Sequence, residues 1–436
     1  MSVAVATAPR VWRRRLSASS FASNVVFMLA GTMLGQAASV LLAPVLTRIY
    51  SPDQFGTLSV YTAVLSILGV MAALGFDGAI PIATGGSELA NLLAVSGVSL
   101  LGTTGLLSIA AWLLPEHAAT SDWLGTLSSC RVLLPLGFFC LGSYYVMVAA
   151  ATWLGAFREI ARTRISQGLS GPISQIALGL LGAGAPGLAI GFVIGQSSGT
   201  LLLASRVYRA VPELRRVVSW QGMVAAMRRY AHFPLFSSWS RVLDMAGGGT
   251  VLFLVFSVCY SPEIAGFMFL TERVIGRPLL IVSTSLLQVF TGEAGQAVRQ
   301  EPALFSRRFR QVVPRQFMLS AAWVLLANLI ASWAFPILFG NQWDAAIPYL
   351  RALSPAYLAL AVLHPVSTSL QILERQVLAA VWQVARLVLV VGSVLAAWRL
   401  GLPAVSALWL GSLAQVVACL AMLALIAMSL RRIQIP

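Results

Sequence analysis

The stretch Ile49–Gly56, IYSPDQFG, separates two long apolar runs, and a near copy of it, CYSPEIAG, stands at Cys259–Gly266 between two others. Both copies keep the order Tyr-Ser-Pro, then an acidic residue and, three positions later, Gly. Proline cannot continue a helix interior and disfavours the α conformation in the residue before it, so each copy predicts a turn between two helices. Each copy follows the first apolar run of one half of the chain, which indicates two similar halves.

The composition places these halves in a membrane. Of the 436 residues, 58% are hydrophobic and only 10% are charged, whereas soluble domains carry about 25% charged residues. Many apolar runs extend over roughly 18 to 25 residues, which is enough to cross a hydrocarbon core about 30 Å thick. A membrane β-barrel would show short alternating segments instead. We therefore predict an all-α polytopic membrane protein.

The net charge of +15 would suit a nucleic-acid partner, but its distribution indicates membrane topology. All 29 basic residues are Arg, and they stand in short blocks between the apolar runs. By the positive-inside rule both termini are predicted to be cytoplasmic, with the two turns outside. The run after Arg13–Arg15 continues to Leu46, too long for a cleaved signal peptide. The four cysteines form no CxxC or Cys/His cluster, so we predict no metal site, disulfide or cofactor.

We predict about twelve transmembrane helices in two six-helix lobes around a central cavity. Residues 1–20 are a basic cytoplasmic tail, 21–215 the N-terminal lobe and 216–436 the C-terminal lobe. Residues 206–229 and 291–315 are interpreted as basic linkers, and the arginine-rich segment at residues 158–164 stands between two predicted helices. The expected helices span about 22–46, 56–80, 89–114, 126–153, 165–182, 187–205, 232–258, 264–290, 316–338, 347–371, 377–398 and 402–430.

Charged residues inside these helices are the candidates for a site. No Walker A, HExxH or DxD pattern is present, so the residues do not indicate an enzyme. A charge near the bilayer centre costs at least about 2.5–3.5 kcal/mol and therefore needs a partner, a cavity or a function. The candidates are Arg48, Asp77, Arg241, Asp244, Glu272, Arg273, Arg277 and Arg386.

Arg273 and Arg277 form the strongest candidate site, because an i,i+4 spacing stacks them on one helix face while Glu272 points about 100° away. Two guanidinium groups suit a phosphate or diphosphate, which they bind through charge-assisted hydrogen bonds. Arg241, Arg386 and Arg48 could contribute to the same cationic cavity. The alternatives are internal pairing, for example of Arg241 with Asp244, and snorkelling to the interface, which fits Arg48 best. Asp77, Asp244 and Glu272 could bind a coupling proton or sodium ion, or pair with arginines.

Three glycines, Gly247, Gly248 and Gly249, interrupt the seventh predicted helix. Each costs about 1 kcal/mol relative to alanine in a helix interior, so they indicate either a hinge or close packing against a neighbouring helix. Gln36 is a lone polar group that could face a cavity or bond across helices. Aromatic residues near the predicted helix ends, among them Trp343, Tyr50 and Tyr260, are interpreted as an interfacial belt.

With these features the chain resembles the bacterial oligosaccharide (polysaccharide repeat-unit) flippases of the multidrug/oligosaccharidyl-lipid/polysaccharide exporter superfamily. It carries their first pattern, Thr-Arg, Tyr, Ser-Pro, an acid and Phe-Gly, within Thr47–Gly56. The second pattern is Gly-Phe at Gly266, Glu-Arg-Val at Glu272–Val274, then Pro278 and Leu-Gln-Val-Phe at Leu287–Phe290. The twelve-helix layout extends the resemblance over nearly the whole chain.

The resemblance implies alternating access between two lobes, and a cargo of undecaprenyl-diphosphate-linked oligosaccharide moved across the bacterial inner membrane. O-antigen, capsule or exopolysaccharide assembly would be the pathway, with a polysaccharide polymerase and a chain-length regulator as further partners. A drug or metabolite exporter of the same superfamily would depend on acidic residues in its cavity. A lipid II flippase usually has two more helices, and a polymerase or ligase usually has a large periplasmic loop, whereas the longest outer loop here has about ten residues.

Overall fold

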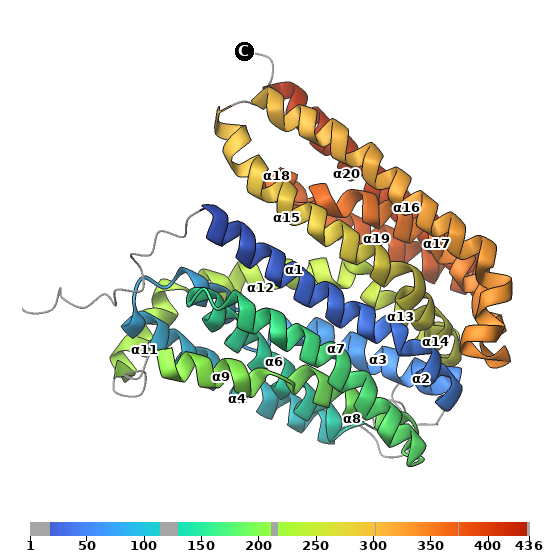
Figure 1. Ribbon diagram of the computed structural model, residues 1–436, viewed down its shortest axis with the longest axis horizontal. Helices are drawn as coiled ribbons and strands as arrows, with labels where there is room; N and C mark the ends of the chain where they lie inside the picture. Colours follow the sequence, from blue (N-terminus) through green and yellow to red (C-terminus); the bar gives the residue numbers. More distant parts are fainter. Residues whose placement is uncertain (1–17, 114–129, 211–216, 301, 374, 434–436) are drawn as a thin grey trace, which may run out of the picture.

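The computed structural model describes residues 18–113, 130–210, 217–300, 302–373 and 375–433. Every regular element in these ranges is helical (Figure 1), which confirms the predicted all-α class. Most of the predicted tail at residues 1–20 and the predicted boundary between residues 215 and 216 lie outside the described residues.

The helices form two lobes, the first blue to green and the second yellow to red in Figure 1. The first lobe contains α1 (Ala18–Leu41), α2 (Ala43–Ile49), α3 (Pro52–Gly69), the 3₁₀ helix η2 (Phe76–Ile82), α4 (Gly86–Trp112), α6 (Leu133–Trp153), α7 (Phe157–Leu180), α8 (Gly184–Ser197) and α9 (Thr200–Ala210). The connecting segment contains α11 (Trp220–Arg229), the π-helix η3 (Phe233–Ser237), α12 (Ser238–Met245) and the π-helix η4 (Ala246–Thr250).

The second lobe contains α13 (Val251–Cys259), α14 (Pro262–Thr271), the π-helix η5 (Glu272–Gly276), α15 (Arg277–Gln300), α16 (Pro302–Phe339), the 3₁₀ helix η6 (Asn341–Ala346), α17 (Ile347–Leu363), the 3₁₀ helix η7 (His364–Val366), α18 (Ser369–Ile372), α19 (Gln376–Arg399) and α20 (Ala404–Ile433). In Figure 1 the lobes meet where α3 lies beside α14, and their helices diverge toward the opposite end. We call the end with both turns the turn end, and the end with α11 the basic end.

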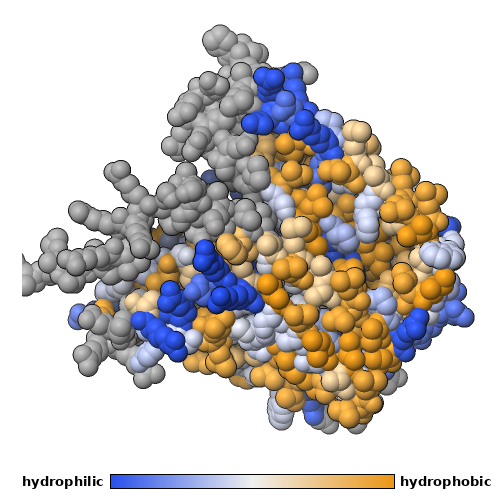
Figure 2. All heavy atoms as spheres, viewed as in Figure 1, coloured by the Kyte–Doolittle hydropathy of each residue, from blue (hydrophilic) through white to orange (hydrophobic). Residues whose placement is uncertain are grey.

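Eight spans in the described part of the chain are long and apolar enough to cross a membrane. The other four predicted helices correspond to α3, α7, α12–α13 and α14–α15. Two of these are broken by π-helical turns, α3 is followed by a 3₁₀ segment, and α7 begins with charged residues. Apolar side chains dominate the described part of the face in Figure 2, with polar clusters toward its margins.

The arginine-rich segments are more regular than predicted. Residues 158–164, which were placed between two helices, form the first turns of α7, and most of residues 291–315 belong to α15 and α16. Apolar runs mark the part of a helix that lies in hydrocarbon, but backbone hydrogen bonding continues into water as long as the residues favour a helix. The predicted helix starts at residues 165 and 316 were therefore too late.

The repeated turns have the same local structure because they share the same capping residues. Ser51 and Ser261 are N-caps whose hydroxyls accept hydrogen bonds from the backbone N–H groups of Gln54 and Ile264, and a proline follows each serine at the first helical position. Tyr50 donates its hydroxyl to the carbonyl oxygen of Gln175 at 2.7 Å. These contacts confirm the predicted turns.

Gly56 and Gly266 explain why glycine recurs in both copies. A Cβ atom added to Gly56 would collide with the carbonyl oxygen of Pro262, and one added to Gly266 would collide with the carbonyl oxygen of Pro52. The two turns therefore pack on each other reciprocally, backbone against backbone. Only glycine permits this approach of α3 and α14.

An aromatic cluster closes the turn end beneath these glycines. We call its members the aromatic closure: Phe55, Phe253, Phe267, Phe269 and Trp343. The Trp343 indole donates to the carbonyl oxygen of Thr47 at 2.9 Å, across the lobes. Trp343 and Tyr50 are at most 1% exposed, so their assignment to an interfacial belt was wrong. Both lie in the core because their polar atoms find hydrogen-bond partners there.

Candidate functional site

Arg273 is held by aromatic rings from both lobes. Its guanidinium carbon lies 5.4 Å from the ring centroid of Phe55 on α3 and 4.8 Å from that of Phe269 on α14. Its Nη1 atom is buried and has no hydrogen-bond partner in the described part of the chain. A buried donor without an acceptor is costly, so Arg273 presents an unused cationic donor directly beneath the aromatic closure.

Arg277 lies on the next turn and is already bonded to an anion. Its Nε donates to Glu272 at 3.1 Å, and its Nη1 donates to Gln36 of α1 at 3.3 Å. The expectation that Glu272 points away from Arg277 was wrong, because η5 is π-helical and brings residues five apart onto one face. Gln36 bonds across the lobes, as one of its two predicted roles required.

Arg241 forms a bidentate ion pair with Asp77 of η2, with N–O distances of 2.9 and 3.1 Å. The alternative prediction, that Arg241 pairs with Asp244, was wrong. The geometry links the start of the seventh predicted helix to the N-terminal lobe, and the carboxylate of Asp77 is thereby neutralised. Asp244 is exposed instead and accepts a 3.4 Å hydrogen bond from Gln383 of α19.

Arg386 is the most buried of the candidate arginines, with 5% exposure. Its guanidinium carbon lies 4.7 Å from the ring centroid of Trp382, and its Nε and Nη2 have no partner among the described residues. Those two atoms form one side of the guanidinium fork, the side that binds a carboxylate or phosphate in bidentate fashion. The fork faces Gly247, where an added Cβ would lie 2.9 Å from both Nε and Cζ.

Arg48 lies apart from these residues at the turn end. Its side chain is exposed and donates to the carbonyl oxygen of Ile337 on α16 at 2.8 Å. The structure thus brings Arg273, Arg277 and Glu272 together and places Arg241 and Arg386 on other helices. Arg48 contributes a hydrogen bond between the lobes.

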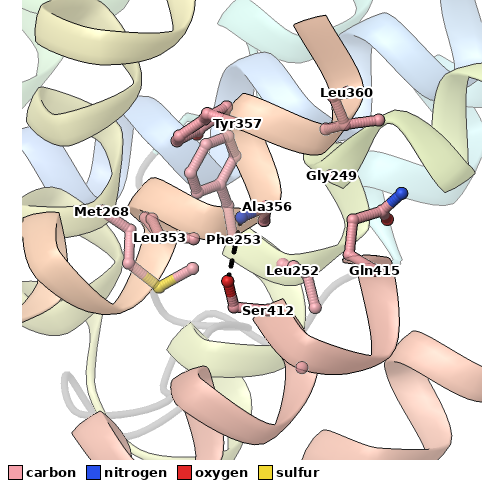
Figure 3. A pocket seen from close by; sticks show the side chains of 11 residues that line it. Gly249, Leu252, Phe253, Met268, Leu353, Ala356, Tyr357, Leu360, Ser412 and Gln415 are labelled. Carbon is pink, nitrogen blue, oxygen red and sulfur yellow. Dashed lines mark hydrogen bonds between the residues drawn. The ribbon is translucent and has the colours of Figure 1, made fainter. Parts of the chain in front are cut away.

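The glycines at 247–249 lie in η4, where the helix is irregular. Gly249 has a φ of 101°, which only glycine adopts readily. A small cavity borders Gly249 inside the second lobe. Figure 3 shows it surrounded by α13, α14, α17 and α20 side chains, with Ser412 accepting a 3.1 Å hydrogen bond from the backbone of Ala356. The irregular backbone at Gly249 therefore lies next to a cavity.

For the alternating-access transporter that the sequence resembles, a hinge at this break predicts that Gly249→Ala slows transport several-fold. The left-handed conformation costs a non-glycine residue about 1–2 kcal/mol, so alanine favours a straighter helix. The initial transport rate in proteoliposomes checks this. Gly392→Ala in α19 is the matched control, because its Cβ would meet nothing within 4 Å. Equal rates for Gly249→Ala and the wild type would argue against a hinge.

Sequence reasoning missed the residues that surround the charges. Phe55, Phe269 and Trp382 provide ring faces for Arg273 and Arg386, but in the sequence they are ordinary apolar residues. Phe55 is the one with a visible signal, because it is the aromatic residue of the first repeated turn, where the second copy has Ala265.

Comparison with solved structures identifies the fold. The chain is similar to an inward-facing multidrug resistance MATE family transporter of the MOP superfamily, with a TM-score of 0.65, 16% identity and 94% and 99% of the two chains covered. An outward-facing multidrug resistance MATE transporter has a TM-score of 0.61 and 17% identity, with 94% of this chain and 96% of that chain covered. A MATE in the bent conformation has a TM-score of 0.60 and 16% identity, with 95% and 96% of the two chains covered. The fold is that of the MOP transporters, which confirms the two-lobed architecture.

The family follows from the sequence. A family model described as "Polysaccharide biosynthesis protein" matches residues 45–348, more than half of the chain, and the chain belongs to this family. Among curated proteins, no sequence matches it. The match confirms the expected link to polysaccharide biosynthesis, and it covers both repeated turns together with Arg241, Arg273 and Arg277.

Proposed function

We propose that this protein moves undecaprenyl-diphosphate-linked oligosaccharide repeat units from the cytoplasmic to the periplasmic leaflet of the bacterial inner membrane. It does so by alternating access, without chemical conversion of the cargo, for the assembly of O-antigen, capsule or exopolysaccharide. The lipid-linked substrate and the bilayer are its direct partners. A polysaccharide polymerase and a chain-length regulator act next on the delivered units.

The observation that carries this proposal is the environment of the Arg273 guanidinium. Between the two lobes lies a cation whose buried donor has no partner among the described residues, in a helix that is predicted to cross the membrane. A diphosphate supplies the missing acceptor, and Arg277 one turn away can share its charge. The corresponding positions of the first repeat are Ala63 and Ile67, so the fold itself does not require these charges.

Glu272 serves as an internal substitute for the cargo in this proposal. Its carboxylate bonds to Arg277 with an Nε–Oε1 distance of 3.1 Å, so an incoming diphosphate displaces it. When the cargo leaves, Glu272 returns and prevents an uncompensated charge in the membrane. The exchange keeps Arg277 paired in both states.

Glu272→Gln is expected to strengthen binding of a short-chain polyprenyl diphosphate roughly tenfold. The amide leaves an acceptor for Arg277 but removes the competing charge, and a hydrogen bond to a charged group contributes about 1.5–3 kcal/mol. Isothermal titration of the purified protein measures the effect. Glu88→Gln, which weakens the pairing of Glu88 with Arg229 at the basic end, is expected to leave the affinity unchanged. Equal affinities for Glu272→Gln and the wild type would refute the competition.

The charge distribution favours a transporter of anions over an exporter of cationic drugs. Asp77 and Glu272 are each bonded to an arginine, so neither carboxylate is available to a cation. Asp244 is the third candidate, and it accepts a hydrogen bond from Gln383. The arginine blocks at the basic end support the proposed orientation, with both termini in the cytoplasm.

Complementation of a bacterial host that lacks its own repeat-unit flippase tests the proposal. Restored surface polysaccharide on gels, with less accumulated lipid-linked intermediate in extracts, is expected. A well-expressed protein that restores neither in hosts with several different repeat units would refute the proposed cargo. Export of cationic drugs by the same cells would favour the alternative function.

A further inference from the structure

The contact between Arg273 and Phe55 joins the candidate anion site to the closure of the turn end. Phe55 belongs to the first lobe, whereas Arg273 and Phe269 belong to the second. The Phe55 ring is fully buried and also packs edge-to-face on Trp343, with centroids 5.0 Å apart. One phenyl ring thus contacts both the cation and the aromatic closure.

A guanidinium can lie over a ring and bond an anion in its own plane, but the anion neutralises the charge that the ring attracts. The ring attracts the guanidinium through its quadrupole, and this attraction is strongest where water is excluded. A diphosphate bonds to the same group through charge-assisted hydrogen bonds, which are directional and stronger. An anion that engages Nη1 of Arg273 therefore weakens the contact with Phe55.

We propose that Phe55 makes opening of the turn end depend on an anionic cargo. Without cargo, Arg273 rests on Phe55 and stabilises the closed turn end. A bound diphosphate draws the guanidinium toward itself and removes that stabilisation, so the lobes separate there preferentially when the anion is present. The inference rests on the proposed function and adds to it a means of rejecting neutral cargo. A ligand that binds the closed and the open state equally well does not shift the equilibrium between them.

The test measures opening at the turn end directly. Asp53 and Glu263 are exposed and occupy equivalent positions in the two turns, so Asp53→Cys and Glu263→Cys carry one spin label on each lobe. The background replaces Cys130, Cys140, Cys259 and Cys419. A fifteen-carbon polyprenyl diphosphate and the corresponding alcohol are the two probes. In the protein with wild-type Phe55, we expect the diphosphate to increase the population with a longer distance between the two labels. We expect no such increase with the alcohol.

Phe55→Leu is expected to open the turn end without any ligand. Loss of a desolvated cation–π contact shifts the ratio of closed to open states by roughly 5- to 30-fold, and the diphosphate then adds little. Phe253→Leu is the matched control, because Phe253 packs on Phe269 at 5.7 Å within the same closure. This variant loses a similar ring but keeps the contact of Arg273 with Phe55, so its opening still requires the diphosphate.

Titration of diphosphate binding separates the two proposals. Binding to wild type with an unchanged label distance, or equal behaviour of Phe55→Leu and Phe253→Leu, overturns the role of Phe55 and leaves the proposed function standing. Failure of the diphosphate to bind wild type, or undiminished binding by Arg273→Ala, overturns both. The comparison of diphosphate with alcohol uses the wild-type sequence at residue 55, so it holds even if Phe55→Leu does not fold.

Discussion

Gly56→Ala is expected to lower the rate of transport at least about fivefold, because the added methyl group keeps the lobes apart at the turn end. The Cβ would collide with the backbone carbonyl of Pro262, and a backbone group cannot move aside as a flexible side chain can. Overpacking of this kind costs about 1–3 kcal/mol, which lowers the population of the closed state roughly 5- to 150-fold. Gly266→Ala introduces the same collision from the other lobe.

The initial rate in proteoliposomes measures the loss of transport. The spin-label distance between residues 53 and 263 measures the separation of the lobes at the turn end. Gly102→Ala in α4 is the control, because a Cβ there would meet nothing within 4 Å. A wild-type rate together with a wild-type distance for Gly56→Ala would show that the reciprocal glycine contact is dispensable.

Arg273→Ala combined with Arg277→Ala is expected to reduce transport of the lipid-linked cargo by roughly 100-fold or more. Each guanidinium contributes charge-assisted hydrogen bonds to the diphosphate, and such bonds are worth about 1.5–3 kcal/mol each. Each single substitution is expected to impair export as well. Membrane insertion is expected to remain intact, since removing an intramembrane charge lowers the cost of insertion.

Surface polysaccharide and the initial flipping rate are the measurements for this series. Arg351→Ala is the control, because Arg351 is exposed on α17 and bonds Ser332 at 3.1 Å. Normal surface polysaccharide from both single variants at native expression would contradict a diphosphate site at these residues. Low protein in the membrane fraction would have to be excluded by blotting.

The sequence predicts the fold well where the determinants are local. Apolar runs locate the membrane helices, and Ser-Pro followed by Gly locates both turns, because capping and the loss of a backbone donor act within a few residues. The π-helical turns η4 and η5 were not predicted as such, although the glycines at 247–249 marked the first of them. An extra residue in a helical turn leaves no periodic signal in an apolar sequence.

The site could be predicted only as a set of charges. Partners such as Asp77 for Arg241 and Gln36 for Arg277 are 164 and 241 residues away, and no spacing rule connects them. The expected geometry of Glu272 failed because it assumed α-helical periodicity. Long-range pairing depends on how the two lobes dock, which is a property of the whole packed structure.

The break at η4 has a mechanical consequence for the helix that begins at the basic end. Arg241 lies about 12 Å from Gly249 and the start of the helix at residue 232 about 25 Å away, at 1.5 Å of rise per residue. A bend at η4 would turn this segment about Gly249. A bend of about 10° there moves Arg241 by about 2 Å and residue 232 by about 4 Å. The first displacement is enough to break the 2.9 Å hydrogen bond to Asp77, so a small rotation at η4 becomes a larger displacement toward the basic end.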